Sequence, residues 1–132
     1  MGIFDFFKRR KTELSDEEKR SNKIWELWEE GKAKSPYAEL MTYQSEVNNG
    51  GHDQYFSNTE NTGNLRKELE ALNSVLPPRL SAALDSAFKA YLMSEKAENE
   101  EKAEQILSQA DDVFFENEEE INRILEDYAA SL

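Results

Sequence analysis

The chain has 132 residues, no cysteine and a formal net charge of −12. This length favours a single domain with an ordinary hydrophobic core, and the lack of cysteine excludes disulfides and thiolate metal sites. We therefore expect an intracellular, cytoplasmic protein. Residues 95–132 hold three basic and thirteen acidic residues, so the negative charge is concentrated at this end. Such a field repels nucleic acid and attracts basic protein surfaces, so we expect no direct binding of nucleic acid.

The first residues differ from the rest of the chain. We expect residues 1–14 to form an amphipathic, basic arm and residues 15–132 to form one all-helical acidic domain. In residues 1–11, a basic cluster, Lys8, Arg9, Arg10 and Lys11, follows the apolar side chains of Ile3, Phe4, Phe6 and Phe7. Aromatic groups beside such a cluster are typical of weak membrane anchors. One interpretation of this segment is therefore contact with a membrane, and the other is a flexible arm or one folded back on its own domain.

Two helices are predicted in the N-terminal half of the domain. Ser15 followed by Glu18 is a capping box, which predicts a helix start, and Gly31 supplies a left-handed stop. The apolar stripe between them is assigned to the core and consists of Ile24, Trp25, Leu27 and Trp28. Ser35 and Pro36 predict a second start. That helix should end at residues 48–51, because asparagine and glycine tolerate positive backbone angles.

The middle of the chain predicts a corner and then two further helices. We expect residues 52–58 to form a tight polar and aromatic corner and residues 59–64 to form a polar loop. Apolar residues at helical spacing then run from Leu65 to Leu76, where Pro77 and Pro78 end the helix. A second stripe follows from Leu80 to Leu92. Because the connection is so short, these two helices should pack against each other.

From Glu98 to the C-terminus, apolar residues again recur at helical spacing. We expect a break between Asp111 and Glu116, because two adjacent aspartates disfavour a helix interior and Phe114 and Phe115 cannot share one face. No alternating pattern of useful length predicts a strand. The predicted fold is all-α, a compact bundle of about five to six helices with a tight Asn-Asn-Gly-Gly corner between helices.

One segment of thirteen residues has an unusual composition, Glu46-Val47-Asn48-Asn49-Gly50-Gly51-His52-Asp53-Gln54-Tyr55-Phe56-Ser57-Asn58. It resembles the signature of a bacterial family of small acidic helical domains, known mainly as a domain of unknown function, whose best-known member is a DNA-mimic protein. These thirteen residues match closely, whereas residues 65–128 match only in pattern and residues 1–14 lie outside the resemblance. An aromatic residue usually stands in that family at the position of His52.

The resemblance implies an all-helical protein that presents carboxylates to a DNA-binding protein in place of phosphates. A homodimer is one of the oligomeric states that it leaves open. Its partner would be a basic protein such as a DNA-binding regulator or a nuclease. The expected partner-binding surface consists of Glu100, Glu101, Glu104, Asp111, Asp112, Glu116, Glu118, Glu119, Glu120, Glu126 and Asp127. A single extended helix over residues 95–132 would carry one net charge per roughly 6 Å, against one per roughly 1.7 Å in duplex DNA. Mimicry therefore requires several acidic faces, or two subunits, to converge; otherwise these carboxylates only keep the protein soluble.

The corner leaves two other functions open. Glu46, His52 and Asp53 are the raw material for a metal-dependent hydrolase, with His52 as proton carrier, or for a small-ligand pocket. The spacing fits no known calcium or phosphate loop, and we expect no cofactor and no bound metal. The structural interpretation is that polar side chains satisfy the backbone of a sharp turn while Tyr55 and Phe56 anchor it. A membrane-peripheral structural protein, tethered by residues 1–11, is the remaining alternative.

Overall fold

The computed structural model describes residues 15–132, which form six helices and no strand. The helices are α2 (Asp16–Glu29), α3 (Tyr37–Thr62), α4 (Leu65–Val75), α5 (Pro78–Glu95), α6 (Glu100–Glu116) and α7 (Glu118–Ala130). The all-α prediction is thereby confirmed. The arm expected over residues 1–14 lies outside the described residues, and so does the membrane contact expected of residues 1–11.

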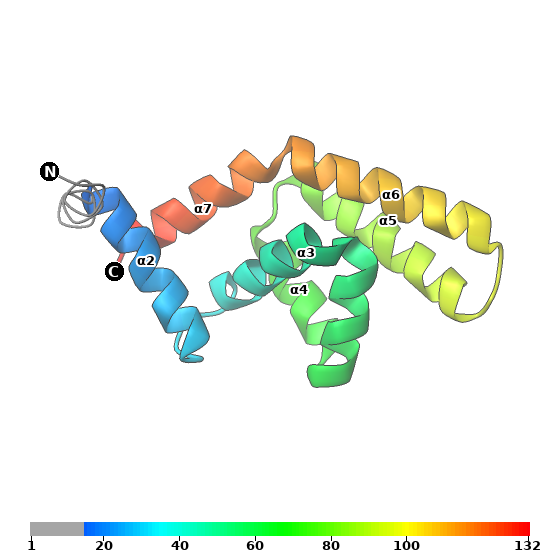
Figure 1. Ribbon diagram of the computed structural model, residues 1–132, viewed down its shortest axis with the longest axis horizontal. Coiled ribbons are helices and arrows are strands. Elements are labelled where there is room, and N and C mark those ends of the chain that lie inside the picture. Colours follow the sequence, from blue (N-terminus) through cyan, green and yellow to red (C-terminus); the bar gives the residue numbers. More distant parts are fainter. Residues whose placement is uncertain (1–14) are drawn as a thin grey trace, which may run out of the picture.

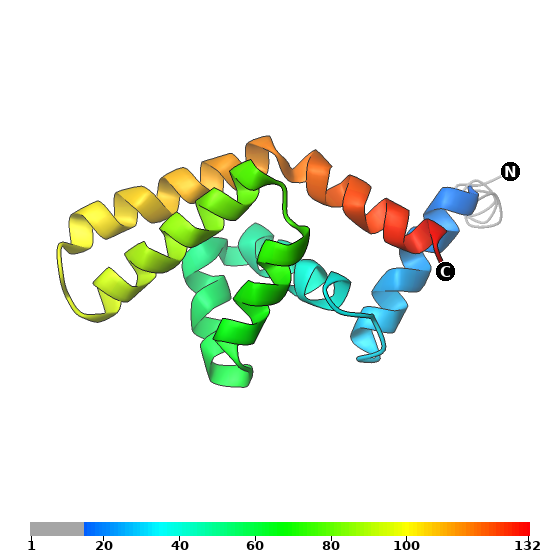
Figure 2. The same ribbon diagram turned by 180° about the vertical axis from the view of Figure 1, so that it is seen from behind.

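Helix α3 lies at the centre of the fold, and α4, α5, α6 and α7 all pack against it. Helices α5 and α6 run antiparallel side by side, and α7 continues from α6 along the same long edge of the molecule (Figure 1). The view from behind shows α2 crossing the far end of α7 (Figure 2). This arrangement places the acidic C-terminal helices along one edge.

The helix boundaries follow from local signals in the sequence. The Ser15 hydroxyl accepts a hydrogen bond from the Glu18 backbone N–H at 3.1 Å, as the capping box predicts. After α2, Gly31 has a φ of 72°, so the predicted left-handed stop is also confirmed. Pro78 is the first residue of α5, where its missing N–H costs no helical hydrogen bond.

The hydrophobic core is built around α3. This helix has buried side chains on both sides of its midpoint, namely Leu40, Met41, Tyr43 and Val47 before it and Tyr55 and Phe56 after it. Single faces of the other helices close the core, for example Leu84 of α5, Phe114 of α6 and Ile121 of α7. Trp25 and Trp28 are only partly buried and pack against the edge of this core.

The segment after the two central glycines is more regular than the sequence predicted. Only Gly50 and Gly51 leave the helical conformation, and residues 52–62 form a second helical half of α3. The corner predicted over residues 52–58 and the loop over residues 59–64 are therefore wrong, apart from the short connection at Gly63 and Asn64. Once two glycines supply the bend, the following residues regain ordinary helical hydrogen bonds.

Two other expectations about the C-terminal half are also wrong. Helix α6 continues through Asp111 to Glu116, and the break falls at Asn117. The adjacent phenylalanines do not interrupt it, because Phe114 is buried in the core while Phe115 is 50% exposed. Helices α4 and α5 make few contacts with each other, since both pack on α3 and α5 has α6 as its main partner.

Candidate functional site

The corner predicted from the motif is a sharp bend in α3. Gly51 has a φ of 79° and a ψ of −178°, a conformation essentially restricted to glycine. A Cβ atom at Gly51 would lie 2.6 Å from the Oδ2 atom of Asp111. A side chain at Gly51 would therefore displace the Asp111 carboxylate, which lies against the bend.

His52 follows this bend, is fully buried, and lies between a hydroxyl and a carboxylate. Its Nδ1 atom is 2.6 Å from Asp111 Oδ1, and its Nε2 atom is 2.6 Å from the Tyr43 hydroxyl. Because a carboxylate only accepts hydrogen bonds, Nδ1 carries a proton, and in the neutral imidazole Nε2 then accepts from Tyr43. The His52 backbone N–H donates to the same Asp111 oxygen at 2.9 Å. This chain of hydrogen bonds ties α6 to both halves of α3.

Aromatic rings enclose this hydrogen-bonded chain. The rings of Tyr43, Phe56 and Phe114 pack around the His52 ring. Burial raises the pKa of Tyr43 far above its usual range, and the neighbouring Tyr55 and Asp111 add to this effect. Tyr43 is therefore a neutral donor at physiological pH. His52 packs as an aromatic ring would at this position and adds two hydrogen bonds.

Glu46 connects the two halves of α3 on the other side of the bend. One of its carboxylate oxygens accepts hydrogen bonds from the Gln54 side chain at 2.9 Å and from the Asn58 side chain at 2.8 Å. Asn49 and Asp53, by contrast, are exposed on the surface of the bend. Of the motif residues, Glu46, Gln54 and Asn58 come together as a clamp, and Tyr55 and Phe56 anchor the second half of α3 in the core.

A second carboxylate connects the bend to α7. Glu118 Oε2 accepts hydrogen bonds from Asn48 Nδ2 at 2.7 Å and from Gln44 Nε2 at 2.9 Å. Gln44 Nε2 also donates to the side-chain oxygen of Asn122 at 2.7 Å. Two of the carboxylates expected on the partner-binding surface, those of Asp111 and Glu118, thus take part in holding the helices together.

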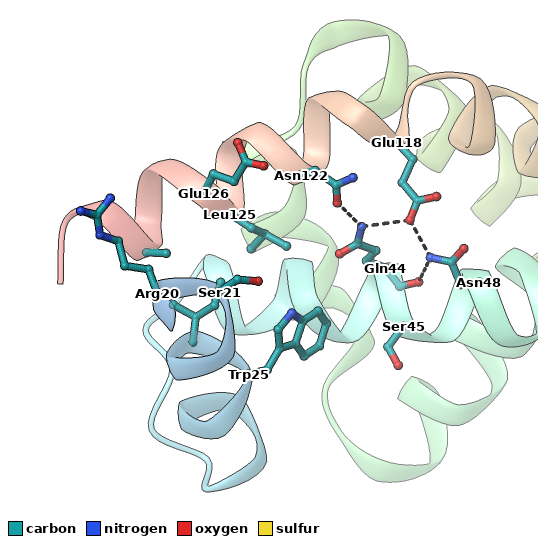
Figure 3. Close-up of a pocket in the computed structure, with 12 residues that line it drawn as sticks. Arg20, Ser21, Trp25, Gln44, Ser45, Asn48, Glu118, Asn122, Leu125 and Glu126 are labelled. Atoms are coloured by element: carbon teal, nitrogen blue, oxygen red, sulfur yellow. Dashed lines mark hydrogen bonds between the residues drawn. The ribbon is translucent and has the colours of Figure 1, made fainter. Parts of the chain in front are cut away.

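Beside these amides a cavity of about 380 Å³ opens between α2, α3 and α7. Figure 3 shows Trp25 of α2 on one side, Gln44 of α3 at the back, and Glu118, Asn122 and Glu126 of α7 along the other side. The sequence interpretation missed this site and assigned Trp25 to the core alone. The spacing of Glu118, Asn122 and Glu126 was the available signal, because residues four apart share one face of a helix.

The other nine acidic residues expected on the surface lie on α6 and α7 with exposed or half-exposed side chains. We name them the acidic ridge: Glu100, Glu101, Glu104, Asp112, Glu116, Glu119, Glu120, Glu126 and Asp127. Within residues 15–132, Lys32 forms an ion pair with Glu30, and the only other close contact between a basic and an acidic side chain is the hydrogen bond of His52 to Asp111. No carboxylate of the ridge is therefore neutralised by a cationic group of the described part of the chain.

Helix stability explains only some of the ridge. Glu100, Glu101, Glu119 and Glu120 lie in the first turns of α6 and α7, where the helix dipole favours negative charge. The other five residues gain nothing from the dipole. The last turns of α6 and α7 even contain acidic residues and no basic one, although negative charge is unfavourable at a helix C-terminus.

The geometry gives no support to the hydrolase alternative. His52 is bonded to Tyr43 and Asp111, not to Glu46 or Asp53, and its ring has no exposed surface. Within residues 15–132, no three His, Cys, Asp or Glu side chains are grouped so that they could hold a metal ion. None of the helices in this part of the chain has the length and apolar character needed to cross a membrane.

Comparison with curated proteins and with solved structures gave no match. Comparison with protein families did: residues 37–132, well over half of the chain, match the family described as DMP19-like protein. The matched region begins at the first residue of α3 and includes the bend, the hydrogen-bonded chain of His52 and the acidic ridge. DMP19 proteins are DNA mimics. The chain therefore belongs to the DMP19-like family.

Proposed function

We propose that this protein is a non-catalytic DNA mimic of the cytoplasm, whose acidic ridge binds a basic DNA-binding protein in place of DNA. Membership of the DMP19-like family supports a protein-binding role of this kind. The partner would be a transcriptional regulator or a nuclease, because such proteins expose a basic groove that normally contacts phosphates.

One observation carries the proposal: the nine carboxylates of the ridge lack cationic partners in the described part of the chain. Five of them, including Glu116 and Asp127, gain nothing from the helix dipole. Charge that does not stabilise its own helices is available for a partner. Exposed Phe115 lies among these residues, and aromatic side chains are enriched in protein interfaces.

The charge density of helices α6 and α7, counted with Asp111 and Glu118 as well as the ridge, indicates what this part of the chain can imitate. From Glu100 to Ala130 the chain has eleven acidic and two basic residues, a net charge of −9. At a rise of about 1.5 Å per residue, α6 and α7 extend over about 46 Å, or about 5 Å per net charge. One strand of B-DNA carries a charge every 3.4 Å or so, and the duplex one about every 1.7 Å. The two helices of one chain therefore carry a charge density somewhat below that of a single strand.

A homodimer would supply a second set of charges, corresponding to the second strand of the DNA. Two ridges side by side would bring the density close to that of the two strands of a duplex. Sedimentation equilibrium measures this directly: we expect the mass of a dimer at micromolar concentration. A strictly monomeric chain would limit the mimicry to one strand of the DNA.

The test is competition with duplex DNA. The protein is immobilised, incubated with a native lysate at low salt, and washed with duplex DNA or with an equal concentration of neutral polymer. We expect DNA to release a basic protein, because both ligands occupy one groove, and we expect capture to fall steeply with added salt. Release of no DNA-binding protein by DNA would count against the proposal.

A pair of variants with equal net charge locates the surface. The first variant neutralises the ridge residues Glu104, Asp112, Glu116 and Glu119 as Gln or Asn. The control neutralises four exposed acidic residues elsewhere, Glu26, Glu29, Asp53 and Glu70. We expect capture to fall at least tenfold in the first and less than twofold in the second. Equal losses would show that net charge alone, without a defined surface, attracts the partner.

A further inference from the structure

We infer that the cavity between α2, α3 and α7 binds a guanidinium group, namely an arginine side chain on the protein partner. This inference rests on the proposed function and adds a specific recognition site to the general attraction of the ridge. Two properties of the cavity support it: a free hydrogen-bond acceptor on Gln44, and the negative charge of the carboxylates that line it.

The deepest polar side chain of the cavity has an acceptor to spare. Gln44 is only 7% exposed, and its Nε2 atom donates to both Glu118 and Asn122. Because both partners are acceptors, the orientation of this amide is fixed, and Oε1 is the atom left over. No hydrogen bond to Oε1 occurs within the described residues, and Figure 3 shows this carbonyl turned toward the side of the cavity formed by α2. This carbonyl is open to the cavity, so it can accept a hydrogen bond from a donor that enters there.

The carboxylates of the cavity also call for a donor, and for a positive one. Glu118 uses Oε2 for its two internal hydrogen bonds, which leaves Oε1 for a ligand. Glu126 lies two helical turns further along the same face of α7, and its carboxylate is exposed. A cation in the cavity would therefore lie near the negative charge of Glu118, which lines the cavity, and near a second carboxylate at the rim. Phosphate or another anion would face both charges.

The wall opposite these carboxylates is aromatic. Trp25 of α2 is partly buried and lines the cavity across from α7 (Figure 3). A guanidinium plane stacks on an indole face, and its fixed fork of N–H donors suits a carboxylate and a carbonyl at once. Lysine would provide a point charge without that geometry. The combination of Trp25, Gln44 and Glu118 therefore favours arginine.

The chain's own cation does not complete the site. Arg20 lies on the rim and is exposed, and it makes no ion pair with Glu118 or Glu126 within the described residues. Figure 3 shows its guanidinium pointing away from Gln44 and Glu118. The volume of about 380 Å³ lies within the range of small-ligand pockets. It accommodates a guanidinium with its aliphatic stem.

The experiment is a titration of the whole chain followed by the indole N–H resonance of Trp25. The probe is N-acetyl-arginine amide, which represents an arginine within a polypeptide. The control ligand is N-acetyl-citrulline amide, which has nearly the same shape but no charge. We expect a saturable shift with the arginine probe and at least tenfold weaker binding of the citrulline probe. Free arginine, added as a third ligand, should bind no better than the capped form.

Two variants with the same change of charge complete the test. Glu126→Gln removes the exposed rim carboxylate, which holds no other helix in place, and should weaken binding of the arginine probe three- to fivefold. Glu70→Gln changes an exposed residue of α4, outside both the cavity and the ridge, and should leave binding unchanged. Equal binding of citrulline, tighter binding of free arginine, a shift caused by phosphate, or the absence of any shift would each overturn the inference. If DNA still releases a partner from the protein, the proposed function stands without this site.

Discussion

Carboxylates of this protein occur in two regions with opposite surroundings. At the bend of α3, Glu46, Asp111 and Glu118 each accept at least two hydrogen bonds from other parts of the chain. Along the acidic ridge the same chemical groups have no ion-pair partner in the described residues. The first set holds helices together, and the second leaves its charge for something outside the chain.

The adjacent residues Asp111 and Asp112 show the contrast most clearly. Asp111 is directed inward, bonded to His52, and its side chain is only 29% exposed, whereas Asp112 points outward. A count of charge along the sequence treats both alike. The difference teaches that an acidic segment divides into structural and interaction residues only when the helix faces are known. Four predictions test this division, from the largest expected effect to the smallest.

Substitution of Gly51 should disrupt the buried set most strongly. Gly51→Ala places a methyl group in a backbone conformation restricted to glycine and 2.6 Å from the Asp111 carboxylate. We expect the free energy of unfolding to fall by about 3 kcal/mol. Urea denaturation measures this loss.

Gly31 provides the matched control for that substitution. It also has a positive φ, 72°, but a Cβ atom there meets nothing within 4 Å. Gly31→Ala should cost only about 1 kcal/mol, the strain of the left-handed conformation alone. Equal losses at the two glycines would mean that the contact with Asp111 contributes nothing.

The second prediction separates the two neighbouring aspartates. Asp111→Ala leaves two buried donors of His52 without a partner and should lower the free energy of unfolding by about 2 kcal/mol. Asp112→Ala removes an exposed side chain and should stay within about 0.5 kcal/mol of the parent. The capture assay should give the opposite order, provided that both variants are folded. Asp112→Ala should weaken capture of the partner although its stability is unchanged, and Asp111→Ala should weaken capture less. A loss of stability at Asp112 comparable to that at Asp111 would contradict the division.

Glu68 lies between the two classes and provides a pH-dependent prediction. It is half-buried, and its Oε2 atom has no hydrogen-bond partner among residues 15–132. Burial, with a smaller contribution from Glu39, raises its pKa above the usual 4.5. A raised pKa favours the protonated form in the fold, so this stability is present below pH 4.5 and is lost as the pH rises through the folded pKa.

Glu68→Gln should therefore stabilise the protein at pH 7 by less than about 1 kcal/mol. Thermal unfolding at pH 4 and at pH 7 tests this, because the advantage of the variant should grow between the two. Glu70→Gln, a change at an exposed residue of the same helix, is the control and should show no such growth. A constant difference across this range would exclude a titration at Glu68.

The smallest effect is expected within the ridge itself. Glu116 ends α6 and lies one turn after Asp112, so both the helix dipole and like charge oppose it. Glu116→Gln should raise the free energy of unfolding by about 0.5 kcal/mol and yet weaken capture of the partner. Glu119→Gln, in the favourable first turn of α7, should lower stability by about as much and weaken capture similarly. If both variants change stability in the same direction, the position of a carboxylate along its helix does not determine its effect on stability.

The sequence by itself determined the helical class, most helix boundaries and the location of the charge. Capping side chains, prolines and glycines act within one turn of the chain, so Ser15, Gly31 and Pro78 could be interpreted without a fold. The motif at residues 46–58 likewise predicted a bend and a family, and residues 37–132 bear the family out.

Tertiary structure alone decided which polar groups meet. His52 contacts Asp111 across 59 positions of sequence, and Gln44 contacts Glu118 across 74. Such partners are chosen by the packing of α3 against α6 and α7, because a polar group removed from water must find a donor or acceptor wherever the fold provides one. The cavity beside Trp25 arises in the same way, where α2, α3 and α7 bring core side chains such as Ile24 and Leu125 together with the polar side chain of Gln44.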